Sequence, residues 1–231
     1  MPGLDNQVVL LLHFDGADGA TSFTDFSPSH HTITPAGTAQ VDTAQSKFGG
    51  ASLLLDGSGD YLTVPDHANW DYGTGDFTID YWVRFNSVSN DQAMVASQIG
   101  NGGMGILIRF GSAGASGVSV FINSTEYTFT WTPSTNTWYH VALTRSGTNL
   151  RAFIDGTQVG TTQTNSTDIT GSTAVFTVGA RNGGGNALNG WLEELRVSKG
   201  IARWTTNFTP PTAPYNRPAM AVAFFEDYNP G

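Results

Sequence analysis

The chain of 231 residues has no cysteine and little charge: 13% of its positions are charged, where soluble domains carry roughly 25%. Without cysteine there is no disulfide framework, and the compartment in which the protein works stays open. A chain so poor in charge is not kept disordered by charge repulsion. Because 39% of the residues are hydrophobic, we expect one domain with a large core, alone or with an appendage.

Basic residues are also scarce, since 10 Lys and Arg stand against 19 Asp and Glu for a formal charge of -9. No stretch gathers the basic residues with aromatics between them, so nucleic acid is not an expected partner. No run approaches the roughly 18 apolar residues of a membrane helix, so no membrane insertion is expected. The residues before Val8 have no cationic start and no small-residue cleavage site, so we also expect no secretory signal.

The hydrophobic pattern is that of β-strands. Within 76–85 every second side chain is apolar, which places these side chains on one face of a strand. Similar segments, each bounded by Gly, Asn, Ser or Pro, follow at 105–110, 118–123, 126–131, 138–145, 150–154 and 174–178. Strands spaced about ten residues apart predict an all-β sandwich or barrel.

Local signals add turns, one central strand and a boundary. The dipeptide Asp155-Gly156 tolerates the positive φ angles of a tight hairpin turn. In 138–144 both alternating sets of positions are largely apolar, which predicts a central strand covered on both faces. At most one helical turn is expected, near 201–204. Because prolines interrupt sheet pairing from Pro210 onward, we predict a domain over 1–211 and an extended C-terminal arm over 212–231.

Two motifs resemble ligand sites but lack the neighbours that the chemistry needs. The glycine-rich stretch 100–105 matches the dinucleotide fingerprint, yet a strand pattern follows it where a helix is required. It is interpreted as a flexible loop between strands. The stretch 56–60 looks like half of an EF-hand loop, but Tyr61 and His67 stand where a glycine and a bidentate glutamate are needed.

Signs of hydrolytic chemistry are also weak. No Gly-x-Ser-x-Gly elbow occurs, and His140, in the middle of a predicted strand, is expected to be buried and hydrogen-bonded. Metal binding at His30 and His31 would need a third ligand that the sequence does not identify. Glu193 and Glu194 are neighbours, and neighbours on a strand point to opposite faces, so no acid/base pair is expected. One of them is expected to face solvent and the other to meet an arginine or a metal.

Short segments spread over most of the chain carry a family resemblance. They lie at 10–16, 24–27, 47–51, 55–62, 75–84, 138–145, 153–156, 188–198, 201–204 and 208–211. In this order they resemble the laminin-G-like, concanavalin A-type jelly roll that is common in bacteriophage and bacterial surface proteins. The resemblance implies an all-β fold of two antiparallel sheets packed face to face. It also implies that 8–14 pairs near 192–197, so that the ends of the domain meet.

A calcium ion at the rim of the sandwich is one property that the resemblance implies. Asp15, Asp25 and Glu193 occupy positions that look like the family's acidic ones, and calcium prefers such oxygen ligands. The sequence departs from the family at Glu193, where Asp is more usual, and at 28–30, where Gly and Asn are common. The alternative is that these acids cap turns through hydrogen bonds to the backbone.

Carbohydrate recognition is the second implied property, with aromatic faces stacking on sugar rings and amides bonding hydroxyl groups. The candidates in predicted loops are Trp70, Tyr72, Asn101, Asn182 and Asn186. The alternative for Trp70 is that it plugs the end of the core, as an aromatic ahead of a strand usually does.

The sequence therefore predicts a non-enzymatic displayed module, with Trp138 and Trp204 assigned to packing. The first hypothesis is a bacteriophage virion component, in a tail, fibre or head surface, that contacts other virion proteins or copies of itself through 212–231. The alternative is a bacterial carbohydrate-binding or adhesion module at the cell surface. Under either hypothesis the candidate ligand is a host-surface polysaccharide.

Overall fold

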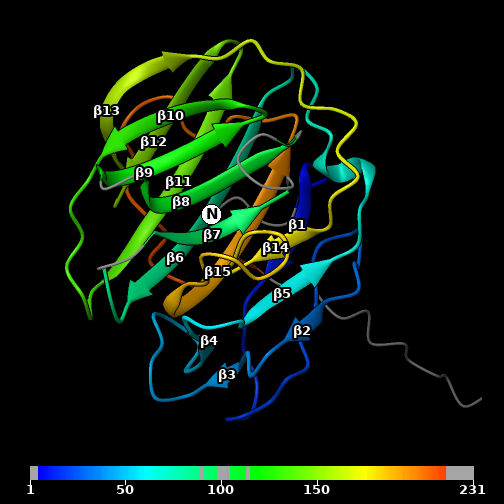
Figure 1. Cartoon of the computed structure of the whole chain (residues 1–231), viewed down its shortest axis with the longest axis vertical. Helices are drawn as coiled ribbons and strands as arrows, with labels where there is room; N and C mark the ends of the chain where they lie inside the picture. Colours follow the sequence, from blue (N-terminus) through cyan, green and yellow to red (C-terminus); the bar gives the residue numbers. More distant parts are fainter. Residues whose placement is uncertain (1–4, 89–90, 98–102, 104, 113–114, 217–231) are drawn as a thin grey trace, which may run out of the picture.

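The computed structural model describes residues 5–88, 91–97, 103, 105–112 and 115–216, which form a sandwich of two antiparallel sheets (Figure 1). The larger sheet contains eight strands: β13 (Thr157–Thr164), β12 (Asn149–Ile154), β11 (Trp138–Ser146), β6 (Phe77–Phe85), β15 (Asn189–Lys199), β4 (Ser52–Asp56) and β3 (Gln40–Asp42) in this order, with β1 (Val8–Leu12) paired to β15. The smaller sheet contains seven: β10 (Thr125–Thr130), β9 (Ala115–Ile122), β8 (Ile106–Ser112), β7 (Gln92–Ala96), β14 (Phe176–Val178), β5 (Tyr61–Val64) and β2 (Thr34–Ala36). The predicted all-β two-sheet sandwich is confirmed.

The long strand β15 joins the two ends of the domain. One of its edges pairs with β6, while the other pairs first with β4 through 189–192 and then with β1 through 195–198. The first strand of the chain therefore lies against the last one, as the sequence predicted. This arrangement leaves residues beyond Lys199 free to return over the larger sheet.

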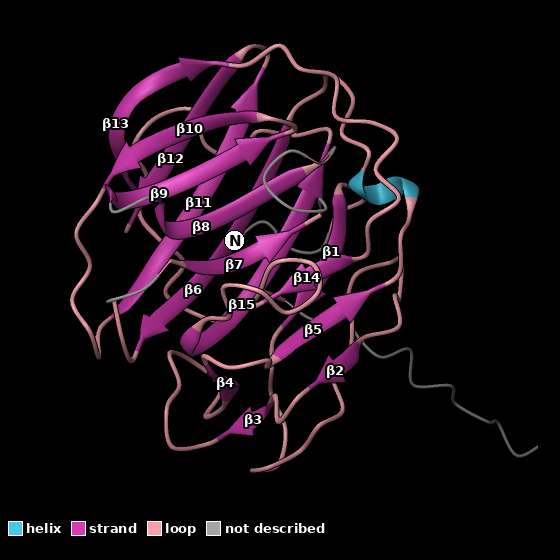
Figure 2. Ribbon diagram, viewed as in Figure 1, coloured by secondary structure: helices cyan, strands magenta, loops and turns pink. Residues whose placement is uncertain are grey.

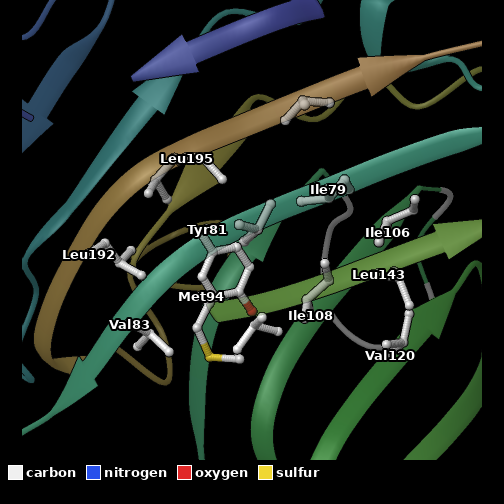
Figure 3. Close-up of a cluster of buried hydrophobic side chains, with 14 of the residues drawn as sticks. Ile79, Tyr81, Val83, Met94, Ile106, Ile108, Val120, Leu143, Leu192 and Leu195 are labelled. Carbon is white, nitrogen blue, oxygen red and sulfur yellow. The ribbon is translucent and has the colours of Figure 1, made fainter. Parts of the chain in front are cut away.

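The core fills the space between the sheets. Figure 3 shows side chains of the larger sheet (Ile79, Tyr81, Val83, Leu143, Leu192 and Leu195) meeting those of the smaller sheet (Met94, Ile106, Ile108 and Val120). All of them are almost fully buried. Because side chains alternate along a strand, burying the odd-numbered residues of β6 sends its even-numbered residues to the outer face of the larger sheet.

The predicted strands and the hairpin are present, whereas the predicted helical turn is not. At the turn between β12 and β13, φ is 48° at Asp155 and 76° at Gly156, as a tight hairpin requires. Residues 201–204 contain no helix, because their carbonyl groups bond to the sheet beneath them. The short helix η1 (Ala68–Trp70), cyan in Figure 2, is a single 3-10 turn. Within the described part of the chain no helix has the length and hydrophobicity needed to cross a membrane.

Arg145, on β11, closes one end of the sandwich from inside. Its buried guanidinium donates to the carbonyl oxygens of Gly73, Gly75 and Thr167 and to Oδ1 of Asn165, at 2.7 to 3.0 Å. Two loops that are far apart in sequence are thereby held by one cation. Without it the carbonyl groups of Gly75 and Thr167 and Asn165 Oδ1 would lose this donor, while the Gly73 carbonyl would keep the Ile169 N–H.

We predict that Arg145→Met lowers the free energy of unfolding by roughly 3–5 kcal/mol, because all five hydrogen bonds of one buried cation are lost together. Urea denaturation measures the loss. Arg151→Met is the control, because Arg151 is half-exposed on neighbouring β12 and a surface change of this kind costs within about 0.5 kcal/mol. Equal effects of the two variants would contradict the role given to Arg145.

Candidate functional site

A layer of buried polar side chains lies on the outer face of the larger sheet. On β6 the core takes Tyr81, so Asp80 and Trp82 point outward. The pairing register places His140 of β11 on one side of Trp82 and Glu193 of β15 on the other. These outward-facing residues are all buried, so something else must cover them.

A β-bulge in β15 places two neighbouring glutamates on that outer face. Glu193 pairs with Trp82 and Arg196 with Asp80, so two residues of β15 lie opposite one residue of β6. Glu194 takes up the extra length with φ of 53°. The prediction that Glu193 and Glu194 point to opposite faces, one of them into solvent, is wrong, because both are buried and both have partners outside the core.

Asp80 is the centre of this polar layer. Its carboxylate accepts hydrogen bonds from Arg196 Nε at 3.0 Å and Nη2 at 3.3 Å, and from the Tyr215 hydroxyl. His140 Nε2 lies 3.3 Å from Oδ2, which confirms that His140 is a buried, hydrogen-bonded residue. Burial alone would raise the pKa of Asp80, but Arg196, His140 and Tyr215 outweigh burial and hold this pKa below its usual range.

Residues 200–216, called the strap below, cover the polar layer. The rings of Trp204 and Phe208 stack at 4.0 Å, and the Phe208 N–H donates to the Gly156 carbonyl. The Tyr215 N–H donates to Glu194 Oε2 at 2.7 Å, and the Arg196 guanidinium lies 3.9 Å from the Tyr215 ring centre. Packing thus continues to residue 216, past the boundary predicted at 211. The rest of the predicted arm, 217–231, lies outside the described residues, and its extended form stays a prediction.

An open groove of about 530 Å³ lies between the strap and the loop that follows β3. It is lined by two tryptophans of the sheet, by two residues of that loop, by the β12–β13 turn and by the strap: Trp82, Trp138, Lys47, Phe48, Asp155, Thr209, Pro210, Pro211 and Thr212. Most of this lining is aromatic or proline ring, with hydroxyl groups and charges at the edges. Such a surface suits a ligand that has both apolar faces and polar groups.

Trp82 lies beneath a cation. Lys47 Nζ is 4.1 Å from the Trp82 ring centre, and Phe48 meets the same indole edge-on at 5.6 Å. The Trp82 Nε1 atom is buried and has no hydrogen-bond partner among the described residues. A donor left in this state costs free energy unless a ligand supplies an acceptor.

The aromatic surface continues beyond the groove. Arg84 of β6 pairs in register with Trp138 on one side and with Trp191 on the other. Its guanidinium lies 4.7 Å from the Trp191 ring centre, and the Trp191 Nε1–H donates to Asp42 at 2.6 Å. Two strand spacings separate Trp138 from Trp191, which is roughly 9–10 Å. We call Trp82, Trp138 and Trp191 the tryptophan platform.

Glu193 holds the loop that supplies Lys47 and Phe48. Its carboxylate accepts the Phe48 N–H at 2.6 Å and the Lys47 N–H. Burial is the main cause that raises the pKa of Glu193 to about 8; these N–H groups oppose the rise, and the nearby Glu194 and Asp15 add to it. The folded protein therefore keeps a proton on Glu193 at neutral pH.

We predict that Glu193→Gln removes part of the pH dependence of stability. The folded pKa of about 8 exceeds the usual 4.5, so the stability contributed by protonated Glu193 is complete below pH 4.5 and is lost as the pH rises to about 8. The unfolding free energy of the parent relative to the variant should fall by roughly 2–4 kcal/mol across this window. Urea titrations at a series of pH values measure this difference, and parallel curves would contradict the prediction.

The loop candidates Trp70 and Tyr72 lie in the core, 1% and 3% exposed. The Trp70 ring packs 4.4 Å from that of Phe176, and its Nε1–H donates to the Pro65 carbonyl at 3.1 Å. Tyr72 packs at 4.9 Å from Phe77. Neither ring has a face open to a sugar, so the stacking role expected of Trp70 and Tyr72 is not possible in this structure. Their burial fits the alternative of a plug at the end of the core.

Asn182 and Asn186 do not line the groove. Asn186 bonds to Arg181 Nη1 at 3.0 Å, and its carbonyl accepts the Ala93 N–H at 2.8 Å, so it holds its own loop against β7 of the smaller sheet. Asn182 is a half-buried residue of the same loop. Asn101 lies outside the described residues. The structure therefore does not bring the predicted sugar-binding residues together.

The three predicted calcium ligands, Asp15, Asp25 and Glu193, are not gathered into one cluster among the described residues. The Asp25 carboxylate accepts hydrogen bonds from the N–H groups of Leu11, Ser27 and His31 and from the Ser27 hydroxyl, so its oxygens are occupied. The oxygens of Glu193 are occupied in the same way. Across the described ranges no group of three or more His, Cys, Asp or Glu could hold a metal ion. Turn capping fits Asp25, while calcium binding elsewhere stays a prediction.

Sequence reasoning missed the groove itself. Trp138 had been assigned to packing, but it is half-exposed and lines the groove, because it lies at the start of β11, where the strap does not cover the sheet. Trp204 does pack, against Phe208. The alternation in 76–85 contained a usable signal, since it puts Trp82 and Arg84 together on the face opposite to the core. Lys47 and Phe48 carried no such signal, because a contact distant in sequence places them.

The fold and the groove together define a lectin-like sandwich domain. Residues 56–203 match the family described as the Concanavalin A-like lectin/glucanases superfamily, and the chain belongs to this family. The resemblance stated from the sequence is thereby confirmed. No curated protein sequence matches the chain.

Several solved structures share the fold. Domain 4 of the extracellular arabinanase AbnA from Geobacillus stearothermophilus, in complex with arabinotriose, is 20% identical with a TM-score of 0.64, over 85% of this chain and 94% of that one. The receptor-binding domain of the botulinum neurotoxin C/D mosaic serotype is 17% identical with a TM-score of 0.62, over 86% and 49% of the two chains. Botulinum neurotoxin type C, whose cell entry depends on interaction with two ganglioside molecules, is 16% identical with a TM-score of 0.62, over 85% of this chain and 49% of that one.

These similarities establish the fold alone. The chain spans about half the length of the toxin chains that it matches, so their receptor contacts are not assigned to it. The solved structures named here are binding domains, whereas the superfamily as a whole includes glucanases.

Proposed function

We propose that the protein is a non-catalytic carbohydrate-binding module whose ligand lies in the groove over Trp138 and Trp82. The observation that carries the proposal is the groove of about 530 Å³, in which the half-exposed indole of Trp138 lies beside the buried indole of Trp82. Aromatic rings provide broad apolar faces for sugar rings, and a few polar groups at the edge fix the orientation of a ligand. The Thr209 and Thr212 hydroxyls, Asp155 and Lys47 lie at this edge.

The state of the acidic residues supports binding without catalysis. A glycosidase needs two carboxyl groups that flank one bond, with one of them free to donate a proton. The paired acids of this face, Glu193 and Glu194, are buried and tied to backbone N–H groups and to His13. The shared fold with an arabinanase domain that is known in complex with arabinotriose supports the sugar-binding proposal.

Display at a bacterial surface as an adhesion module fits this function directly. A place on a bacteriophage particle, in a tail, fibre or head surface, remains the second form of the proposal, in which residues 212–231 contact other virion proteins or copies of this chain. Both forms use the same groove on a host or neighbouring polysaccharide.

We predict that Trp138→Ala weakens glycan binding by at least fivefold, which corresponds to about 1 kcal/mol for a lost stacking face. A glycan array identifies ligands of the intact chain, and isothermal titration calorimetry then compares the variant. Because Trp138 is half-exposed, circular dichroism should show an unchanged fold.

Asn182→Ala is the matched control for this prediction. Asn182 is also partly exposed and belongs to the first set of candidates, but its loop packs on the smaller sheet. We expect its affinity to equal that of the parent. Loss of binding in Asn182→Ala with retention in Trp138→Ala would place the ligand on the smaller sheet, and an array without any bound glycan would contradict the proposed function.

A further inference from the structure

We propose that the groove is specific for an acidic glycan, and that Lys47 and Arg84 bind the carboxylate of a uronic acid while its ring lies on the tryptophan platform. This inference rests on the proposed function and names the class of ligand. Neither cation was a candidate from the sequence. The geometry around Trp82 points to both.

The two cations lie near each other on the outer face of the larger sheet, Lys47 over the Trp82 ring and Arg84 over the Trp191 ring. Lys47 Nζ is 4.1 Å from the Trp82 ring centre. Arg84 follows Trp82 by two residues on β6, so both side chains are on the outer face with their Cα atoms roughly 7 Å apart. A sugar that stacks on the half-exposed Trp138, which pairs in register with Arg84, therefore meets a positive charge from the strand, and Lys47 supplies another from the loop across the groove.

Neither cation has an anionic partner within the described ranges. Lys47 is exposed, and its described contacts are with the rings of Phe48 and Trp82. Arg84 lies over Trp191, and its Nη1 atom is buried without a hydrogen-bond partner. A buried guanidinium N–H without an acceptor is costly, and a carboxylate that accepts from this planar group forms the strong, charge-assisted kind of hydrogen bond.

The acids around the groove are already engaged. Asp42 accepts from Trp191 Nε1 and from the Ala44 N–H, and Asp155 accepts from the His140 N–H. Glu193 is bonded to backbone N–H groups and keeps its proton at neutral pH. No salt bridge between these acids and Lys47 or Arg84 is present among the described residues, so both cations remain available to an anionic ligand.

The whole protein has a formal charge of -9, which opposes the approach of an anionic ligand. Exposed charges are screened over about 8–10 Å at physiological ionic strength, so the distant acids contribute little at the platform. Recognition of an anion then depends on the nearby cations. A preference based on these cations should weaken as salt is added.

The test compares ligands that differ in charge alone. Oligogalacturonides and their methyl esters have the same sugar rings, and further pairs of uronate oligosaccharides and esters extend the panel. With the intact chain we expect at least tenfold tighter binding of the acid in calorimetry. Lys47→Gln and Arg84→Gln should each reduce this preference at least threefold, and the double variant should bind acid and ester equally.

Arg151→Gln is the matched control. Arg151 pairs with Thr144, six residues along β11 from Trp138, and so lies roughly 20 Å away on the same sheet. Its Nη1 atom also lacks a partner, and we expect an unchanged preference for the acid. An equal reduction in Arg151→Gln would mean a general charge effect and would overturn the assigned site.

The outcomes separate this inference from the proposed function. If the parent binds acids and esters equally and Trp138→Ala binds neither, the acidic specificity is overturned. The sugar-binding groove of the proposed function then still stands. Binding of neutral glycans alone would also overturn the acidic specificity and leave the sugar-binding groove in place. No binding to any member of the panel or of the glycan array overturns both.

Discussion

The buried ion pair of Asp80 and Arg196 is the interaction on which the outer half of this structure depends. A sandwich needs one core, and the side chains between its sheets provide it. The larger sheet carries a second buried layer on its outer face, and that layer is polar. Two opposite charges removed from water are tolerable when they are close and fully hydrogen-bonded, and Asp80 meets this condition through Arg196, His140 and Tyr215.

The same interaction fixes the strap and hence the groove. Near its C-terminal end the strap contains Tyr215, whose hydroxyl donates to Asp80 and whose N–H donates to Glu194. Four residues of the strap, Thr209 to Thr212, line the groove on one side and a smaller cavity of about 220 Å³ on the other. Because these four residues have open space on both sides, the strap is held in position by the contacts at its two ends. The polar layer therefore acts on the ligand site indirectly, by holding one wall of it.

The fold could be predicted from the sequence because it depends on alternation, which is local. The strand in 76–85, the turn at Asp155-Gly156 and the pairing of the two ends all followed from patterns within a few residues or from the order of family-like segments. The bulge at Glu194 could not be predicted in this way. The bulge adds one residue to β15. A simple count of alternating faces along the strand therefore assigns the residues after the bulge to the wrong face.

The site was less predictable because loops were searched for aromatic residues, whereas the exposed aromatics lie on strands. Trp70 precedes a strand and enters the core, while Trp138 begins a strand and stays half-exposed. What separates them is the path of residues 200–216, which covers His140 but stops short of Trp138. Coverage of a sheet face by a returning segment is a property of the tertiary structure, and no pattern in either tryptophan's own neighbourhood encodes it.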